Sequence, residues 1–338
     1  MTYRLTQKTS LHGCSCKLPK KELSELLQKA KIEETKDERV LAGIWDDAGI
    51  IKVSDNIVVV QHLDFFTPVI DDPYIQGQIA ACNSASDVFA KGATDILGVL
   101  VIMANPTDMP DDVSTQLIRG FHDLCLTLKA PIVGGHTILC PWPLMGGSVT
   151  AMVKASKVVY NSTAKDGDLL FLTKPLGTQP IMAILRVPPE EQEELTKDIP
   201  KHVVSKAIDK AIESMTTPNK DAAEAMIEAE VNAATDVTGF GILGQATTMA
   251  KRSNINIMLH TLPVIEGAIE LSKEFGYGLE EGVSAETSGG LLISTPKKKA
   301  DLLISLLERR KIPAYEVGTV KMGEGNASLS KKLEMIEV

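Results

Sequence analysis

The order of apolar patterns along the chain predicts an α+β fold with two domains. The 338 residues favour two domains, because single domains commonly have roughly 100–200 residues. Strand and helix patterns follow one another without the strict alternation of a doubly wound α/β sheet. A strand pattern at 169–173 follows an Asp-Gly-Asp turn, which indicates a new domain there. We therefore expect an N-terminal arm and helix over 1–44, a first domain over 45–157 and a second over 158–338.

The N-terminal segment reads as a flexible arm followed by a helix. Residues 1–18 are polar and show no periodicity, so we expect them to be flexible. Pro19 comes next, and proline suits the first turn of a helix. A charged stretch at 31–40 reads as a solvated linker. The apolar residues of the expected helix recur at helical spacing: Leu23, Leu26, Leu27 and Ala30.

The first domain begins with a buried strand and a helix of unusual composition. A β-branched run predicts a strand from 57 to about 64. The helix expected at 74–91 is rich in small residues and ends at Gly92. Small side chains on a helix indicate that another backbone or a ligand comes close to it. Further elements are strands at 96–103, 132–133 and 148–155, and a helix that opens at Pro110.

The second domain alternates less regularly. Helices are expected between about 179 and 230, and Pro189 and Pro200 interrupt them. A glycine-rich turn after 234 feeds another helix. The remaining expected elements are a helix at 263–275, a turn and strand within 286–295, a helix that starts at 297, and strands at 314–320 and 333–338.

Composition restricts the class of protein. The net charge of −9 repels phosphate backbones, so we expect no nucleic-acid partner. No stretch approaches the ~20 apolar residues of a membrane helix, and the start lacks the apolar core of a signal peptide. The five cysteines are an odd number in a long chain, which favours reduced thiols over a disulfide framework. We therefore expect a cytoplasmic protein with no membrane partner.

Five aspartates stand outside the solvated faces that carry most of the acids. An ionised carboxylate in apolar surroundings is costly unless it is paired or bound to a metal. Acids that converge from separate segments would bind a hard cation such as Mg²⁺ together with phosphate oxygens. The alternatives are an N-cap role for Asp236 and an ordinary turn at Asp46 and Asp47. The five are Asp46, Asp47, Asp64, Asp87 and Asp236.

Other features near these acids are weaker signals. Asn83 and Asp87 are four residues apart, so both side chains can face one ligand from one side of a helix. Glycine-rich turns at 134–137, 238–241 and 288–290 would direct backbone N–H groups at anions. The chain has no GxxxxGK[ST] motif, which excludes a P-loop nucleotide site. The lone histidines, His62 and His136, are more typical of structural roles than of metal ligands.

The arm carries two thiols one residue apart, Cys14 and Cys16, with Lys17 directly after them. A structural zinc site needs about four ligands, and no second close pair exists in the sequence. A regulatory or metal-transfer dithiol is a second interpretation. The third is a reactive thiolate, since a nearby ammonium lowers the pKa of a thiol and a mobile arm keeps it accessible.

Taken in order, these segments resemble the selenophosphate synthetase family, also called selenide, water dikinase. The resemblance covers nearly the whole chain, and its longest motifs are LTKPLGTQ and ATDVTGFGILG. It implies a PurM-like two-domain ATP-binding fold, with N-terminal domains that form a β-barrel across a homodimer. It implies synthesis of selenophosphate from selenide, ATP and water, with release of AMP and phosphate. The matching segments lie at 13–17, 45–50, 63–74, 82–93, 134–137, 172–179, 234–244 and 286–292.

The same resemblance implies roles for individual residues. Cys14 and Lys17 match catalytic positions. Asp47, Asp87 and Asp236 match ligands of Mg²⁺ ions that hold the ATP phosphates, and K⁺ is the expected monovalent activator. A selenium-delivery protein is a further expected partner. The positions that match ATP contacts are Lys17, Ile44, Trp45, Asp46, Asp64, Asp87, Gly135, His136 and Thr137.

The chain departs from the family pattern at a few positions. His62 and Leu63 stand where the family usually has two threonines, Gln245 replaces a histidine and Ala285 replaces a proline. None of these departures removes an expected metal ligand or the thiol. Two rival hypotheses remain. One is another PurM-like ATP-dependent kinase or synthetase, and the other is a non-catalytic Cys-x-Cys protein that handles selenium or metal.

Overall fold

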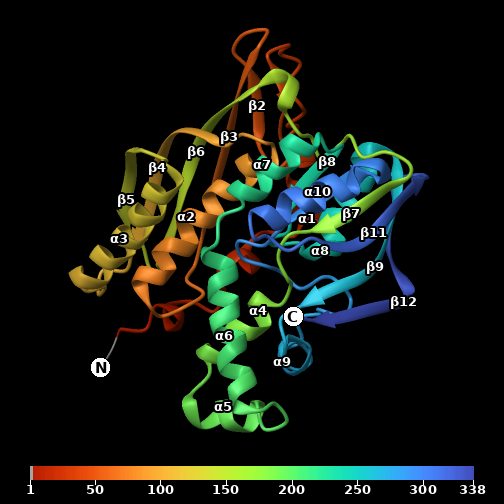
Figure 1. Cartoon of the computed structure of the whole chain (residues 1–338). Coiled ribbons are helices and arrows are strands. Elements are labelled where there is room, and N and C mark those ends of the chain that lie inside the picture. The colour runs from red at the N-terminus through yellow and green to blue at the C-terminus, as the bar shows by residue number, and fades with distance from the viewer. Residues whose placement is uncertain (1–2) are drawn as a thin grey trace.

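The computed structural model describes residues 3–338, which build two six-stranded sheets with helices packed on them (Figure 1). The first sheet has the order β1-β2-β3-β6-β4-β5, and neighbours are antiparallel except the parallel pair β4 and β5. Its strands are β1 (Val40–Ala42), β2 (Gly49–Lys52), β3 (Ile57–Phe66), β4 (Asp95–Asn105), β5 (Ile132–Leu139) and β6 (Leu144–Lys154).

The second sheet has the order β12-β9-β11-β7-β10-β8. Its neighbours are antiparallel except β12 and β9, which are parallel. The expected α+β mixture, in which strands and helices do not alternate strictly, is confirmed. The strands are β7 (Asp168–Leu172), β8 (Ala233–Asp236), β9 (Ile255–Val264), β10 (Leu291–Pro296), β11 (Tyr315–Met322) and β12 (Ala327–Glu337).

The helices fall largely where the apolar periodicity predicted them. Pro189 and Pro200 do interrupt the helical region of the second half, since one starts α5 and the other caps α6. The α-helices are α1 (Lys20–Lys29), α2 (Pro73–Ala90), α3 (Asp111–Leu128), α4 (Thr178–Ala183), α5 (Pro189–Leu195), α6 (Lys201–Thr216), α7 (Lys220–Ala229), α8 (Gly241–Ser253), α9 (Ala268–Phe275) and α10 (Ala300–Arg309). The 3₁₀ helices are η1 (Leu5–Lys8), η2 (Gly13–Cys16), η3 (Ala155–Lys157), η4 (Ile184–Arg186) and η5 (Lys297–Lys299).

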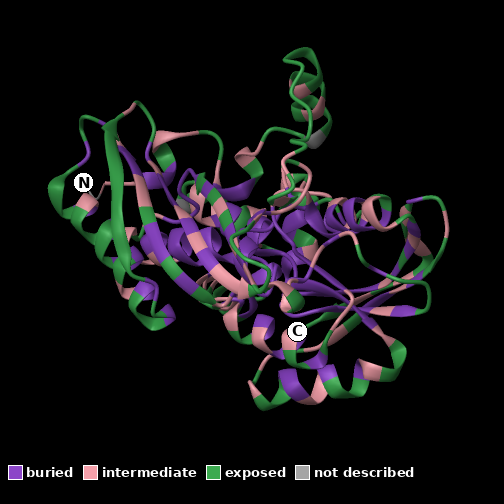
Figure 2. Ribbon diagram, turned by 90° about the horizontal axis from the view of Figure 1, so that it is seen from above, coloured by how far each residue is buried: buried purple, intermediate pink, exposed green. Residues whose placement is uncertain are grey.

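Helix α2 is the central element of the molecule. It packs on β3 and β6 of the first sheet and against α3, and most of its residues are buried (Figure 2). A Cβ atom at Gly120 of α3 would lie 1.9 Å from the carbonyl oxygen of Tyr74, so the two helix backbones are in direct contact. The expectation that another backbone approaches this small-residue helix is therefore confirmed.

Some expectations for regular elements were wrong. The strand expected at 333–338 already begins at Ala327. The strand that begins at Ile132 runs on to Leu139, so 134–137 pairs with β4 as strand and is no turn. The helix expected from Pro263 starts only at Ala268, because Pro263 still belongs to β9. Proline is tolerated at that point since the antiparallel pairing of β9 with β11 already ends at Leu259.

The N-terminal arm is more ordered than the sequence predicted. Arg4 forms an ion pair of 2.7 Å with Asp71, and Leu5 is fully buried. Helix α1 forms as expected, but Leu23 and Leu26 on it are exposed to 42% and 53%. Residues 3–16 are polar in sequence but pack on the protein through backbone and ionic contacts. The apolar face of α1, in contrast, is not covered by this chain. In the described part of the chain, no helix has both the length and the apolar character needed to cross a membrane.

Candidate active site

A strand and a helix hold the core of the site in matched register. His62 and Asp64 point to the same face of β3, because strand side chains alternate. They meet Asp87 and Asn83 of α2: His62 Nε2 lies 2.9 Å from Asp87 Oδ2, and Asn83 Nδ2 donates to Asp64 Oδ2 at 2.7 Å. Two strand residues span ~6.7 Å and four helix residues ~6.0 Å, so both contacts form together.

The N-terminal arm brings Lys17 to the contacts between β3 and α2. Lys17 Nζ donates to Asp64 Oδ2 at 2.7 Å, and the Asp64 side chain is only 8% exposed. Burial works to lower the pKa of Lys17, but the acidic groups around it, Asp64 and Asp87 among them, outweigh burial and raise that pKa well above its ordinary value. The ammonium is therefore a permanent positive charge beside the carboxylate.

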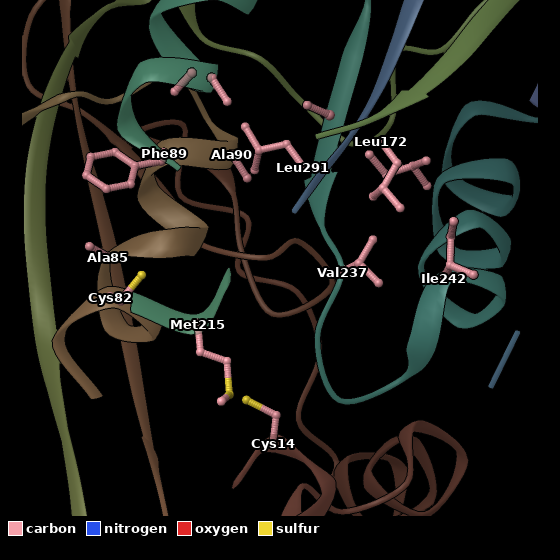
Figure 3. Close-up of a cluster of buried hydrophobic side chains, with 14 of the residues drawn as sticks. Cys14, Cys82, Ala85, Phe89, Ala90, Leu172, Met215, Val237, Ile242 and Leu291 are labelled. Carbon is pink, nitrogen blue, oxygen red and sulfur yellow. The ribbon is translucent and has the colours of Figure 1, made fainter. Parts of the chain in front are cut away.

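Cys14 lies inside the protein in this conformation. Its backbone N–H donates to Thr287 Oγ1 at 3.1 Å, and its thiol donates to Asn83 Oδ1 at 3.2 Å. Figure 3 shows Cys14 on a cluster of buried side chains that also includes Cys82 and Met215. A Cβ atom at Gly239 would lie 2.5 Å from the Cys14 carbonyl oxygen, so the arm rests directly on the turn after β8.

The expectation of an accessible thiol with a lowered pKa is wrong for this conformation. Burial raises the pKa of Cys14, and the opposing effect of Lys17 is smaller. Cys16 is half-buried, and burial raises its pKa too. With the arm packed, Cys14 is thus a neutral hydrogen-bond donor.

Asp46 and Asp47 meet a buried lysine from the end of α2. Lys91 Nζ lies 2.7 Å from Asp46 Oδ1 and 2.6 Å from Asp47 Oδ2, and the Lys91 side chain is 0% exposed. Burial would lower the pKa of Lys91, but Asp47 and Asp46 together raise it above its ordinary value. The Asn161 side-chain amide donates to Asp47 Oδ1 at 3.4 Å. The two acids are therefore more than an ordinary turn.

Asp236 at the end of β8 completes what we call the acid cluster: Asp46, Asp47, Asp64, Asp87 and Asp236. Neither carboxylate oxygen of Asp236 has a well-formed hydrogen bond, although the residue is 1% exposed. Burial raises the pKa of Asp236 well above its ordinary value, and the charges of Asp87 and Asp47 raise it further. The N-cap alternative for Asp236 does not account for these unpaired oxygens, since α8 begins later, at Gly241.

These observations test whether the site suits a divalent cation. Buried oxygens without partners and carboxylates that repel one another are the donor set of a hard cation such as Mg²⁺. Among the described residues, His62, Asp64 and Asp87 also offer ligand atoms within 4.8 Å of one another. The residues present therefore fit a divalent cation.

His62 changes the charge of the cluster. Burial would lower its pKa, but Asp87 and Asp64 outweigh burial and raise the pKa of His62 to about 9. His62 in turn helps to lower the pKa of Asp87 against the effect of burial. Lys17, His62 and Lys91 therefore face the acid cluster as cations, in addition to Arg252 beside Asp46.

Not all expected ATP contacts lie at the cluster. Ile44 is exposed, and Trp45 lines a cavity of about 800 Å³ between α1 and α8. Gly135, His136 and Thr137 lie on exposed β5, which Figure 2 shows at the edge of the first sheet. Strands β6 and β4 separate β5 from β3, which places β5 ~14 Å from the strand of Asp64. The single chain does not bring these three residues to the acids.

Sequence reasoning missed Lys91 and set His62 aside. Asn83, Asp87 and Lys91 recur at i, i+4 and i+8, which is one polar stripe on a helix of small residues. That spacing was the available signal for Lys91. His62 precedes Asp64 by two on a strand, so alternation alone places both side chains on one face.

Comparison with known proteins first gives the class that this fold and site define. The N-terminal domain of AIR synthase related proteins matches residues 45–153, and the C-terminal domain matches 165–329. A thiamine-monophosphate kinase from Stenotrophomonas maltophilia superposes with a TM-score of 0.66 at 18% identity, over 93% of this chain and 97% of that one. A hydrogenase maturation protein HypE solved with ATP gives 0.65 at 15% identity, over 97% and 94%. The two-domain PurM-like fold is therefore confirmed.

Sequence relatives narrow the class to one family. A selenide, water dikinase from Methanocaldococcus jannaschii is 48% identical over 345 residues, which cover 99% of this chain and 98% of the relative. One from Methanococcus maripaludis is 45% identical over 97% and 99%. One from Trypanosoma brucei brucei is 36% identical over 99% and 90%. The chain belongs to the selenide, water dikinase family.

Proposed function

We propose that this protein makes selenophosphate from selenide, ATP and water, with release of AMP and phosphate. The observation that carries the proposal is the meeting of the Cys14 and Lys17 arm with buried acids, in a chain related over its full length to selenide, water dikinases. ATP is the phosphoryl donor in this proposal and selenide is the acceptor. A protein that delivers selenium is a proposed further partner.

Asp47, Asp87 and Asp236 are the proposed holders of divalent cations, with Mg²⁺ as the expected ion and K⁺ as a monovalent activator. When bound, the divalent ion supplies neutralisation and orientation of the phosphate oxygens. The unpaired oxygens of Asp236 and its raised pKa support this role, because a cation would relieve both. Asp87 would exchange its contact with His62 for this ligand.

Lys17 supplies positive charge at the transferring phosphate. Phosphoryl transfer depends mainly on positioning and on stabilisation of charge that spreads over the phosphate oxygens. Lys17 Nζ donates a hydrogen bond of 2.7 Å to Asp64 Oδ2, so its ammonium already faces the acids that would surround the phosphates. We propose that Asp64 and the turn 44–46 contact ATP beside it.

Cys14 handles the selenium in this proposal. The packed arm keeps the thiol neutral and away from water. A soft chalcogenide has to reach a cage of hard oxygens, and a thiol on a segment that opens and closes would bring it there. Burial of the arm also excludes bulk water, whose early attack on ATP would waste the nucleotide.

We propose a homodimer in which the first sheets of two chains join into a barrel. All eight residues of β5 are exposed, including Val133 and Leu139, which are 62% and 74% exposed. An uncovered apolar edge strand favours pairing with another strand. A second chain would also bring its own 135–137 segment toward a site that the single chain leaves without it. The division into 1–44, 45–157 and 158–338 is part of the same proposal.

The test is phosphorus NMR of ATP, Mg²⁺ and selenide incubated with the protein. Selenophosphate, AMP and phosphate should appear together, and without selenide no selenophosphate should form. Cys14→Ser should lower the selenide-dependent rate at least tenfold while binding of an ATP analogue survives. Cys16→Ser is the matched control from the same motif and should retain most of the rate. Full activity of Cys14→Ser with selenide would make the thiol accessory, and absence of AMP from the native protein would refute the reaction.

A further inference from the structure

Lys91 is a buried cation that none of the expected roles includes. It is the residue directly after α2, one helical turn beyond Asp87. Its ammonium has three hydrogens, and three oxygens surround it: Asp46 Oδ1 at 2.7 Å, Asp47 Oδ2 at 2.6 Å and the Ala234 carbonyl at 3.5 Å. All donors are therefore committed to the protein, and the side chain has no exposed surface from which to reach a substrate.

We propose that Lys91 is a fixed cation that takes the place of a divalent ion between Asp46 and Asp47. Two buried carboxylates on adjacent residues would otherwise require such an ion, since an uncompensated buried charge is strongly unfavourable. The ammonium supplies the positive charge permanently, at a contact distance that suits N–H donors rather than a metal bond of ~2.0–2.1 Å. The acid cluster then binds one divalent ion fewer than its five carboxylates would allow.

This arrangement also defines which oxygens remain for metal. Asp47 Oδ2 is committed to Lys91, while its other oxygen receives only the long 3.4 Å contact from Asn161. Asp46 Oδ1 receives the Asp47 backbone N–H in addition to Lys91, and its second oxygen lies 3.8 Å from Arg252. The second oxygen of Asp46 has no hydrogen bond within the described part of the chain. Lys91 thus occupies one oxygen of Asp46 and one of Asp47, and Asp47 keeps a single oxygen for the ion that it would share with Asp87 and Asp236.

Lys91 in addition ties the two halves of the molecule together at this point. Asp46 and Asp47 precede β2 of the first sheet, and Ala234 belongs to β8, the strand that carries Asp236. A diffusible ion in the same place would leave that junction dependent on metal concentration. A covalently attached ammonium keeps the acids and β8 together when no metal is bound.

The inference rests on the proposed role of Asp47, Asp87 and Asp236 as metal ligands, but not on the selenide chemistry. Its test counts bound ions by electron paramagnetic resonance of Mn²⁺, with and without the ATP analogue AMPPCP, and needs no turnover. The native protein and Lys91→Met are compared. Removal of the ammonium should raise the number of Mn²⁺ ions per chain by one, and Asp46→Asn in the Lys91→Met background should remove that extra ion.

Lys174→Met is the matched control, because Lys174 is also buried but its ammonium donates to backbone carbonyls. It should leave the Mn²⁺ count unchanged. The melting temperature gives a second readout. With a chelator present, Lys91→Met should melt at a much lower temperature than the native protein. Addition of Mn²⁺ should raise the melting temperature of Lys91→Met by more than it raises that of the native protein.

Two outcomes would overturn the inference. One is a folded Lys91→Met with the native ion count. The other is the loss of an ion in Asp46→Asn alone, measured without AMPPCP, because in this proposal Asp46 binds no metal while Lys91 occupies it. Asp46→Asn keeps Lys91, so this variant tests the inference even if Lys91→Met does not fold. A native protein that binds no Mn²⁺ with AMPPCP would instead contradict the proposed metal ligands themselves.

Discussion

Two buried lysines in this molecule have pKa values that are shifted in opposite directions. Lys91, beside Asp46 and Asp47 at the acid cluster, has a pKa raised above its ordinary value. Lys174, which follows β7, has a pKa lowered by burial. Its ammonium donates to the carbonyls of Ser214, Thr217 and Ser288 at 2.9, 2.6 and 2.7 Å.

The difference lies in what each charge faces. Full opposite charges offset the free energy of removing an ammonium from water, whereas carbonyl dipoles offset only part of it. Glu286, two residues before the Ser288 carbonyl that Lys174 bonds, follows the same rule for an acid. It faces the N–H groups of Gly177 and Thr178 and the Thr178 hydroxyl, and burial still raises its pKa to about 7. Ion pairs thus offset the burial of Lys91 at the acid cluster, while the 286–290 region uses buried polar contacts to hold loops together.

The largest expected effect is at the acid cluster. Asp87→Asn should lower AMP formation by about 10³-fold, because a neutral amide holds a divalent cation more weakly than a carboxylate does, and the cation is what neutralises the phosphate charge. A coupled assay of AMP release measures it. Asp112→Asn, on the exposed first turn of α3, is the control and should retain the native rate. Near-normal AMP formation by Asp87→Asn would show that the reaction does not depend on the Asp87 carboxylate, and would remove the functional difference between the acid cluster and the surroundings of Lys174.

Lys174→Met should cost stability more than chemistry. Three buried carbonyls would lose their donor, which lowers the free energy of unfolding by about 3 kcal/mol. Urea unfolding measures this loss. Lys210→Met, whose lysine is partly exposed and forms a surface ion pair with Glu213, should change it by less than ~0.5 kcal/mol. Equal stabilities of the two variants would show that the carbonyl cage contributes little.

Glu286 gives a prediction with a definite sign in pH. Its pKa is raised from 4.5 to about 7 in the folded protein, so the folded state binds more protons than the unfolded state between those values. Stability from this group is therefore complete below about pH 4.5 and falls by up to about 3 kcal/mol as the pH rises to about 7.

Glu286→Gln removes this titration and should reduce the loss of stability between pH 5 and pH 7. Denaturant unfolding at both pH values checks it, with Glu281→Gln on the surface as the control. The same pH dependence in native protein and Glu286→Gln would mean that the carboxyl stays ionised throughout.

The sequence predicted the local parts of this site well. The strand expected to end near Asp64 and the four-residue spacing of Asn83 and Asp87 place three of the groups that meet between β3 and α2. The arm was predicted less well, because Leu5 and Cys14 are buried by contacts with segments far along the chain. Lys91 was missed since a lysine after a helix is ordinarily a solvated C-terminal residue.

By itself, the sequence determined the helices, most of the strands and the chemical types available at the site. These follow from periodicity and from the side chains themselves, which are local properties. Only the tertiary structure decided that Lys17 meets Asp64, that Lys91 meets Asp46 and that Asp236 is buried without a well-formed hydrogen bond. The physical reason is that desolvation and ion pairing depend on which distant segments pack together, and that packing sets the charge of every group in the cluster.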